Sequence, residues 1–97
     1  MNEFLNIVRA ASKSIHNGRT KRNIYDHLIS EAYELNYELG LENHDLEPGE
    51  DGIFGESIDV IACALDMIFV DNPDVTDQEI IDYLRKKVQK WKDKNEY

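Results

Sequence analysis

The chain has 97 residues, of which 41% are apolar, and this supports one small domain (1–97) with a modest core. Its net charge is −9. No apolar run is long enough to span a bilayer, and the sequence opens without the basic-then-apolar pattern of a signal peptide. A lone cysteine, Cys63, excludes an internal disulfide and agrees with a reducing compartment. We therefore expect a cytoplasmic protein with no membrane partner.

The charges are separated along the chain. All eleven Lys and Arg residues lie within 9–22 or 85–94, whereas 17 of the 20 acidic residues lie between them, in 23–84. This acidic middle would repel a nucleic-acid backbone, so we expect no nucleic-acid partner. It would attract a multivalent cation or a cationic protein surface.

Helical periodicity begins near the N-terminus. Apolar residues follow the spacing i, i+4, i+7, i+11 at Phe4, Val8, Ala11 and Ile15. This first helix is expected to stop near Asn17-Gly18. Thr20 then provides a cap for a second helix that is expected to run to Gly40.

The second half of the chain predicts a loop and two more helices. Residues 41–54 contain a proline, two glycines and five acids, which indicates a solvated loop. A third helix is expected from about Gly55 to Val70. Thr76 and Glu79 form a capping-box pattern before a fourth helix. The fourth helix is expected to turn four residues inward: Ile80, Leu84, Val88 and Trp91. The predicted fold class is all-α, a small four-helix unit.

The third helix carries acids on an otherwise apolar surface. At 100° per residue one sector contains Glu56, Asp59, Cys63 and Asp66. The remaining circumference is almost wholly apolar, which is typical of a helix inside a core or a subunit interface. Four helices of this length can hardly surround it within one chain, so we predict a homo-oligomer.

The second helix carries a matching acidic stripe at Glu31, Glu34 and Glu38. If the two helices are antiparallel neighbours, Glu31 and Glu34 would face Glu56 and Asp59. Carboxylates about 4–6 Å apart repel unless they protonate, separate or share a cation. With oxygen ligands only, Mg²⁺ fits best and Mn²⁺ second. The alternative is a solvated acidic face, with Glu56 merely complementing the helix macrodipole.

The motif Glu31-Ala-Tyr-Glu34, then 21 residues, then Glu56-Ser-Ile-Asp59 resembles that of the all-α nucleoside triphosphate pyrophosphohydrolases. This superfamily includes MazG-like proteins, dimeric dUTPases and phosphoribosyl-ATP pyrophosphohydrolases. The resemblance covers about residues 20–70. It implies a MazG-like four-helix unit that packs across a homodimer or homotetramer interface. It also implies Mg²⁺-dependent cleavage of an NTP or dNTP to the monophosphate and pyrophosphate.

The resemblance also implies roles for particular residues. Glu31, Glu34, Glu56 and Asp59 would be metal ligands, and Glu34 or Glu38 would orient or deprotonate the attacking water. Many MazG-like proteins have a lysine shortly before the second motif, but this chain has none there. Phosphate-binding charge would then come from other basic residues, and the candidates are Lys13, Arg19, Lys21, Arg22, Arg85 and Lys86.

Two other functions fit parts of the pattern. A non-catalytic acidic helical protein that binds a basic partner would explain the net charge and the base-free middle. It would not explain Asp59 and Asp66 on an apolar helix. A degenerate MazG-like relative that keeps the fold without turnover would explain the missing lysine.

Overall fold

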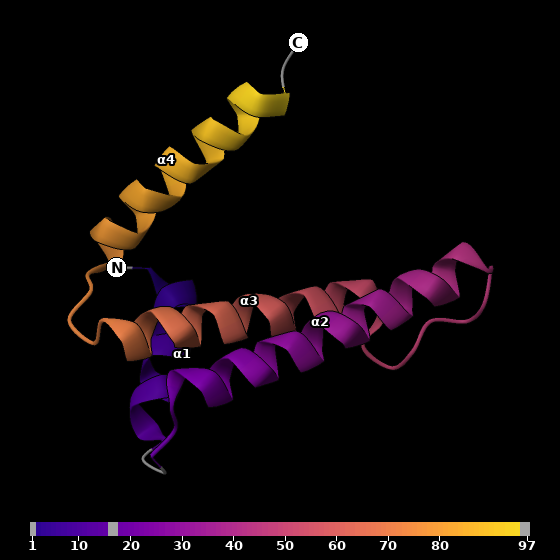
Figure 1. Ribbon diagram of the computed structural model, residues 1–97, viewed down its shortest axis with the longest axis horizontal. Coiled ribbons are helices and arrows are strands. Elements are labelled where there is room, and N and C mark those ends of the chain that lie inside the picture. Colours follow the sequence, from indigo (N-terminus) through magenta and orange to yellow (C-terminus); the bar gives the residue numbers. More distant parts are fainter. Residues whose placement is uncertain (1, 16–17, 96–97) are drawn as a thin grey trace.

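The computed structural model describes residues 2–15 and 18–95 (Figure 1). Within these ranges it contains four helices and no strand, which confirms the all-α prediction. The helices are α1 (Glu3–Ser14), α2 (Lys21–Asn43), α3 (Gly52–Asp71) and α4 (Asp77–Asn95). Among the residues described, none of these helices combines the length and apolar character needed to cross a membrane.

Local side-chain chemistry sets the starts of α2 and α4. The Thr20 hydroxyl accepts a hydrogen bond from the Asn23 backbone N–H at 3.1 Å, and the Asn23 side chain accepts one from the Thr20 N–H at 3.0 Å. The same reciprocal pattern opens α4, where Glu79 N–H donates to Thr76 Oγ1 and Thr76 N–H donates to Glu79 Oε1. Both predicted caps are therefore confirmed.

The loop between α2 and α3 is shorter than the predicted 41–54. α2 continues to Asn43, and Asp45 then adopts a left-handed backbone conformation with φ of 54°. The Leu46 N–H donates to the Leu41 carbonyl at 2.9 Å, which closes the helix end. α3 begins at Gly52, three residues before Gly55. α1 ends at Ser14, and the predicted stop at Asn17 lies outside the described residues.

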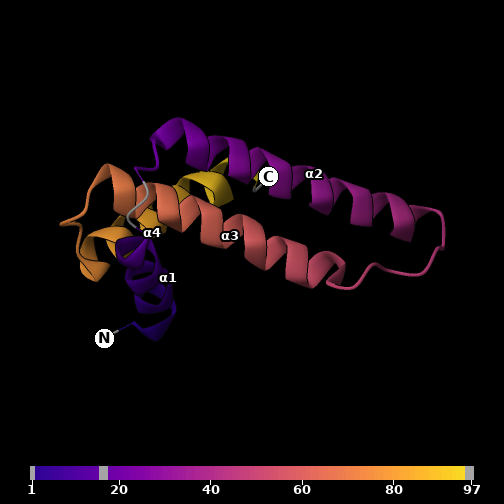
Figure 2. The ribbon, with the colours of Figure 1, turned by 90° about the horizontal axis from the view of Figure 1, so that it is seen from below.

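The helices α2 and α3 form a long antiparallel hairpin, and α1 packs across the C-terminal part of α3 (Figures 1 and 2). The hydrophobic core lies at that end of the hairpin, where Leu5 of α1 meets Leu65 and Phe69 of α3. Val8, Val75 and Ile80 pack around it. The other end of the hairpin, toward the 44–51 loop, therefore lacks this cover.

The helix α4 departs from the predicted arrangement. Ile80 contacts the core as expected, but every residue from Asp82 to Asn95 is exposed. The prediction that Leu84, Val88 and Trp91 point inward is therefore wrong within this chain. The reason is the direction of the helix, which leaves the core end of the hairpin and points away from it (Figure 1).

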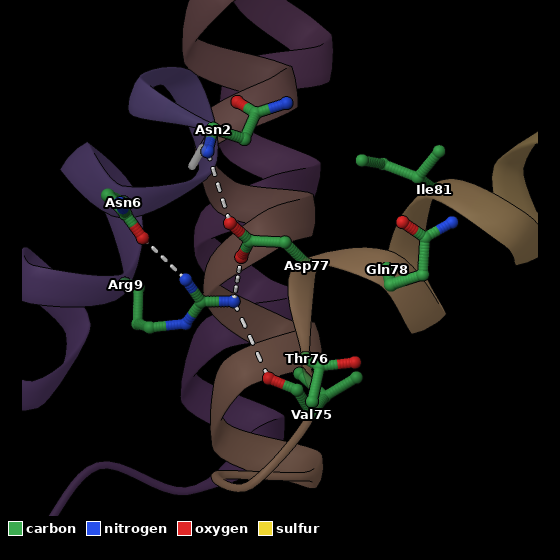
Figure 3. A pocket seen from close by; sticks show the side chains of 8 residues that line it. All are labelled: Asn2, Asn6, Arg9, Val75, Thr76, Asp77, Gln78 and Ile81. Carbon is green, nitrogen blue, oxygen red and sulfur yellow. Dashed lines mark hydrogen bonds and ion pairs between the residues drawn. The ribbon is translucent and has the colours of Figure 1, made fainter.

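The first turn of α4 is fixed in this direction by contacts with α1 (Figure 3). Arg9 Nη2 forms an ion pair with Asp77 Oδ1 at 2.5 Å, and the Asn2 N–H donates to Asp77 Oδ2 at 3.3 Å. Arg9 also donates to Asn6 Oδ1 at 2.6 Å and lies over the Phe69 ring. The hydrogen bond from Arg9 is the main cause that lowers the pKa of Asp77, so this carboxylate stays charged near neutral pH.

Candidate metal centre

Four carboxylates from the two hairpin helices converge at its middle. Glu31 and Glu34 come from α2, and Glu56 and Asp59 come from α3. One oxygen from each lies within 4.8 Å of the other three. Their three-residue spacing places each pair on one helix face, and the antiparallel packing of the helices brings the two faces together. The predicted convergence of these four side chains is therefore present.

The site places carboxylate oxygens where water reaches them poorly. Glu56 is only 7% exposed, although it lies near the start of α3. Glu31 Oε2 and Glu56 Oε2 are buried and accept no hydrogen bond from the described part of the chain. A buried carboxylate oxygen without a partner is costly, and a cation bound here would supply the missing partner.

The electrostatics of the cluster point the same way. Burial, followed by the hydrogen bond and charge of Glu34 and the charge of Asp59, raises the pKa of Glu56 to about 7. Burial and the charges of Glu34 and Asp59 also raise the pKa of Glu31, against an opposing contribution from His27. Without a cation the cluster therefore tends to keep a proton near neutral pH. A divalent ion would remove that tendency because it favours the ionised form.

A cavity of about 370 Å³ opens beside the acids. It is lined by residues of α2 and by one residue of α3, namely Ser30, Tyr33, Glu34, Tyr37, Glu38 and Glu56. Glu34 is exposed at this cavity, and the rings of Tyr33 and Tyr37 are about two-thirds exposed. The cavity gives a ligand direct access to Glu34 and Glu56, and it offers two aromatic faces beside them.

Glu38 lines this cavity but has a structural partner. Its carboxylate accepts hydrogen bonds from the Gly49 N–H, at 2.9 Å to Oε1 and 3.2 Å to Oε2, and it is only 6% exposed. Glu38 thus ties the 44–51 loop to α2 and lies outside the four-carboxylate cluster. Of the two residues predicted to activate water, Glu34 is the one in the cluster.

The contact between Glu38 and Gly49 predicts how one added methyl group at position 49 changes the stability of the protein. A Cβ at Gly49 would lie 2.3 Å from Glu38 Oε2, so Gly49→Ala must displace the carboxylate from its backbone donor. We expect a loss of about 1–3 kcal/mol in the free energy of unfolding, because a buried carboxylate loses its partner. Urea denaturation measures this loss.

The matched control is Gly40→Ala, in the last turns of α2. A Cβ at Gly40 meets no atom within 4 Å, so this variant is expected to gain about 0.5–1 kcal/mol through helix propensity. A Gly49→Ala protein as stable as the wild type would show that the Glu38–Gly49 contact contributes nothing.

Asp66 shares the acidic sector of α3 but belongs to a different contact. Its carboxylate accepts hydrogen bonds from both terminal nitrogens of Arg19 and, at 2.7 Å, from the Ser12 hydroxyl. Burial would raise the pKa of Asp66, but these hydrogen bonds outweigh it and hold the pKa below its usual range. Asp66 therefore joins α1 and the segment before α2 to α3. Cys63, one turn away, is buried.

The predicted phosphate-binding residues lie outside the described lining of the cavity. Arg19 is paired with Asp66, Lys21 with Asp71 at 2.6 Å, and Arg22 with Asp26 at 3.3 Å. Lys13 is exposed on α1, and Arg85 and Lys86 are exposed on α4, which points away from the hairpin. Their contact with substrate stays a prediction.

His27 is a neighbour of the site that the motif reasoning did not assign. Its Nε2 lies 3.1 Å from Glu31 Oε1, one helical turn away on α2. Such an i, i+4 pair fixes the position of the Glu31 carboxylate, whose Oε2 has no hydrogen-bond partner among the described residues. The four-residue spacing of His27 and Glu31 was the signal in the sequence.

The fold and the site together define an all-α four-helix protein with a cluster of four carboxylates, one of them buried, between two antiparallel helices. Comparisons of the chain with protein-family models, curated proteins and solved structures gave no significant match.

Proposed function

We propose that this chain is a Mg²⁺-dependent nucleoside triphosphate pyrophosphohydrolase that converts an NTP or dNTP to the monophosphate and pyrophosphate. The observation that carries the proposal is the cluster of four carboxylates, with buried oxygens of Glu31 and Glu56 that lack a hydrogen-bond partner among the described residues. The motif spacing that resembles the MazG-like proteins supports the same reaction.

The donor set fits a hard divalent cation. Every candidate ligand is a carboxylate oxygen, and the group has space on the cavity side for water and phosphate oxygens. When bound, Mg²⁺ would supply charge neutralisation at the phosphates and a lowered pKa for nearby water. Mn²⁺ would be the second choice for the same ligands. Glu56 is buried and Glu31 has one buried oxygen, so these two residues would provide the fixed part of the site.

The chain's own residues would position the substrate and water. Glu34 faces the cavity and is the most exposed of the four acids, so we assign it the role of orienting the water and accepting its proton. The water oxygen would form a bond to the α-phosphorus while the bond from this phosphorus to the bridging oxygen breaks. Pyrophosphate would leave with the electron pair. Tyr33 and Tyr37 would stack on the base beside the cavity.

Product analysis tests this proposal. The purified protein is incubated with each NTP and dNTP, with Mg²⁺ or with EDTA, and the products are separated by ion exchange. We expect monophosphate and pyrophosphate in equal amounts, only with metal. Orthophosphate with a diphosphate would mean that a different bond is cleaved. Absence of turnover in folded, Mg²⁺-loaded protein would contradict the proposed reaction.

One observation favours a second function. The described lining of the cavity contains no Lys or Arg, so the phosphates would lack a direct positive partner within one chain. A degenerate MazG-like protein that binds metal or a basic partner without turnover agrees with this. Metal binding without hydrolysis of any nucleotide would favour this second function.

The enzyme would act as a homodimer or homotetramer. Within one chain, only five apolar residues are buried among those described. A partner subunit would cover apolar surface of α3 that this small core leaves exposed.

A further inference from the structure

The chain exposes more surface than a compact monomer of its size. Its accessible surface is 7619 Å², whereas a folded monomer of 11.3 kDa is expected to expose about 5,700 Å². Its radius of gyration is 15.7 Å, against about 12.5 Å for a compact domain of this length. The excess, about 1,900 Å² per chain, falls in the range that stable subunit interfaces bury.

Part of this excess is one apolar face of α3. Between Gly52 and Val70 every exposed residue is apolar. We call this set the α3 stripe, and its members are Phe54, Ile58, Ile61, Ala64 and Ile68. Their spacing of three and four residues places them on one side of the helix, opposite the acids that face α2. The α3 stripe is therefore the outer face of the hairpin.

A second apolar face lies on α4. Leu84, Val88 and Trp91 continue the line of Ile80 along one side of the helix, and we call these three residues the α4 stripe. They are 59%, 40% and 65% exposed, respectively. The last fourteen described residues of α4 are all exposed, and such a helix is marginal in water because most helical stability in proteins comes from packing.

The charges of α4 and of the α2–α3 hairpin are opposite in sign. Residues 85–94 of α4 contain six basic side chains and one acid, whereas residues 23–84 contain no Lys or Arg. A basic helix laid along the hairpin would be attracted by the exposed acids of α2 and of the 44–51 loop. Each copy of this chain carries both the basic part of α4 and the acidic hairpin, so two copies can pair reciprocally.

The α4 helix of the same chain is held away from the α3 stripe. Arg9 and the backbone of Asn2 hold Asp77 at the start of α4 (Figure 3). Val75 and Ile80 are packed against the core. Folding back onto the outer face of α3 would break these contacts. A second copy can occupy that face while they stay intact.

We propose that two copies exchange α4, so that the α4 stripe of each packs on the α3 stripe of the other. The contact is reciprocal, as a two-fold axis requires. Covering the excess surface of both chains would bury about 3,800 Å², a size typical of obligate dimers. The basic half of α4 would lie beside the acidic hairpin of the second copy. This proposal concerns assembly and does not depend on nucleotide hydrolysis.

Light scattering with paired variants tests the exchange. The wild-type chain is expected to have at least twice the 11.3 kDa mass of one chain at micromolar concentration. Leu84→Glu in the α4 stripe and Ile61→Glu in the α3 stripe should each give a monomer. Gln89→Glu is the control, because it adds the same charge on the opposite face of α4 and should keep the assembly.

Mixing the two disruptive variants gives the sharper result. A mixture of Leu84→Glu and Ile61→Glu chains can form one contact between intact stripes, so it should recover a dimer that neither variant forms alone. Misfolded variants would not recover in this way. Three results would each overturn the proposal: a monomeric wild type, an assembly that either stripe variant leaves intact, or a mixture that stays monomeric.

Trp91 provides an independent signal, because it is the single tryptophan of the chain. It is expected to emit at shorter wavelength in the assembly than in the Leu84→Glu monomer. A monomeric wild type with shielded Trp91 would instead show that α4 folds back onto its own chain. Emission from the wild-type assembly that matches the monomer would also contradict the exchange.

Discussion

Glu56→Gln is expected to stabilise the metal-free protein at pH 8 and, in the same variant, to abolish its stabilisation by Mg²⁺. Glu56 is the most buried of the four acids, and its pKa of about 7 shows that the ionised form is disfavoured there. A neutral amide removes the repulsion with Glu34 and Asp59 and can donate a hydrogen bond to them. It also removes one anionic ligand from the cation.

The expected size of the stabilisation by Mg²⁺ follows from mass action. For the wild type, Mg²⁺ at about 100 times its Kd should add about 2.7 kcal/mol to the free energy of unfolding. This corresponds to a rise in thermal midpoint on the order of 10 °C for a domain of this length. The rise should be absent in Glu56→Gln, and turnover should fall by about 100-fold or more.

The control for this prediction is Glu42→Gln, which removes the same charge from an exposed position of α2. It should change the thermal midpoint of the metal-free protein by no more than about 1 °C. The increase in this midpoint on adding Mg²⁺ should stay the same. If Glu56→Gln destabilised the metal-free protein and kept the Mg²⁺ response, the cluster would be a structural network of acids without a cation.

The second large effect is the pH dependence of stability with and without metal. The pKa of Glu56 is about 7 in the folded protein and about 4.3 in an unfolded chain, so the folded state binds this proton more tightly. The stability that Glu56 contributes is therefore complete below about pH 4.3 and is lost as pH rises through about 7. The raised pKa of Glu31 acts in the same direction.

Other shifted carboxylates act in a different pH range. The pKa values of Asp66 and Asp77 are lowered, so their contributions are present above the unfolded value of about 3.9 and are lost only as pH falls below it. We therefore expect the stability of the metal-free protein to decline between pH 5 and 8 because of the cluster.

Metal should reverse this decline, because it binds the ionised carboxylates. Thermal midpoints measured from pH 5.5 to 8.5 should fall with pH in EDTA, and the rise caused by Mg²⁺ should grow over the same range. In Glu56→Gln both trends should be reduced. A Mg²⁺ effect that is as large at pH 5.5 as at pH 8.5 would contradict competition between protons and metal at these acids.

The sequence was sufficient to predict the four acids of the site. Helical spacing places Glu31 beside Glu34 and Glu56 beside Asp59, and a hairpin is the simplest connection between two helices joined by a short loop. Both inferences need only local geometry and chain connectivity. The cluster is present because these rules hold without long-range detail.

Other contacts depend on packing that local patterns do not specify. Asp66 has the same helical phase as Asp59, yet it pairs with Arg19 because the segment before α2 passes beside α3. Glu38 continues the stripe of Glu34 but reaches the Gly49 N–H, since the loop folds back toward α2. Neither partner is close in sequence, so spacing alone grouped both acids with the site.

The direction of α4 likewise could not be predicted from local sequence patterns. Its apolar stripe correctly predicts an amphipathic helix, but periodicity does not say which surface covers the stripe. The choice depends on the contact of Arg9 with Asp77, 68 residues apart in the chain, which sets the angle at which α4 leaves the core. The predicted inward face is consequently exposed within one chain.

Anomalous scattering from crystals grown with Mn²⁺ is the most direct test of the central claim that these four acids share a divalent cation. We predict one or more anomalous peaks between α2 and α3, with oxygens of Glu31, Glu56 and at least one of Glu34 and Asp59 at about 2.0–2.2 Å. Crystals that show no peak there, with the four carboxylates turned apart into solvent, would contradict the claim.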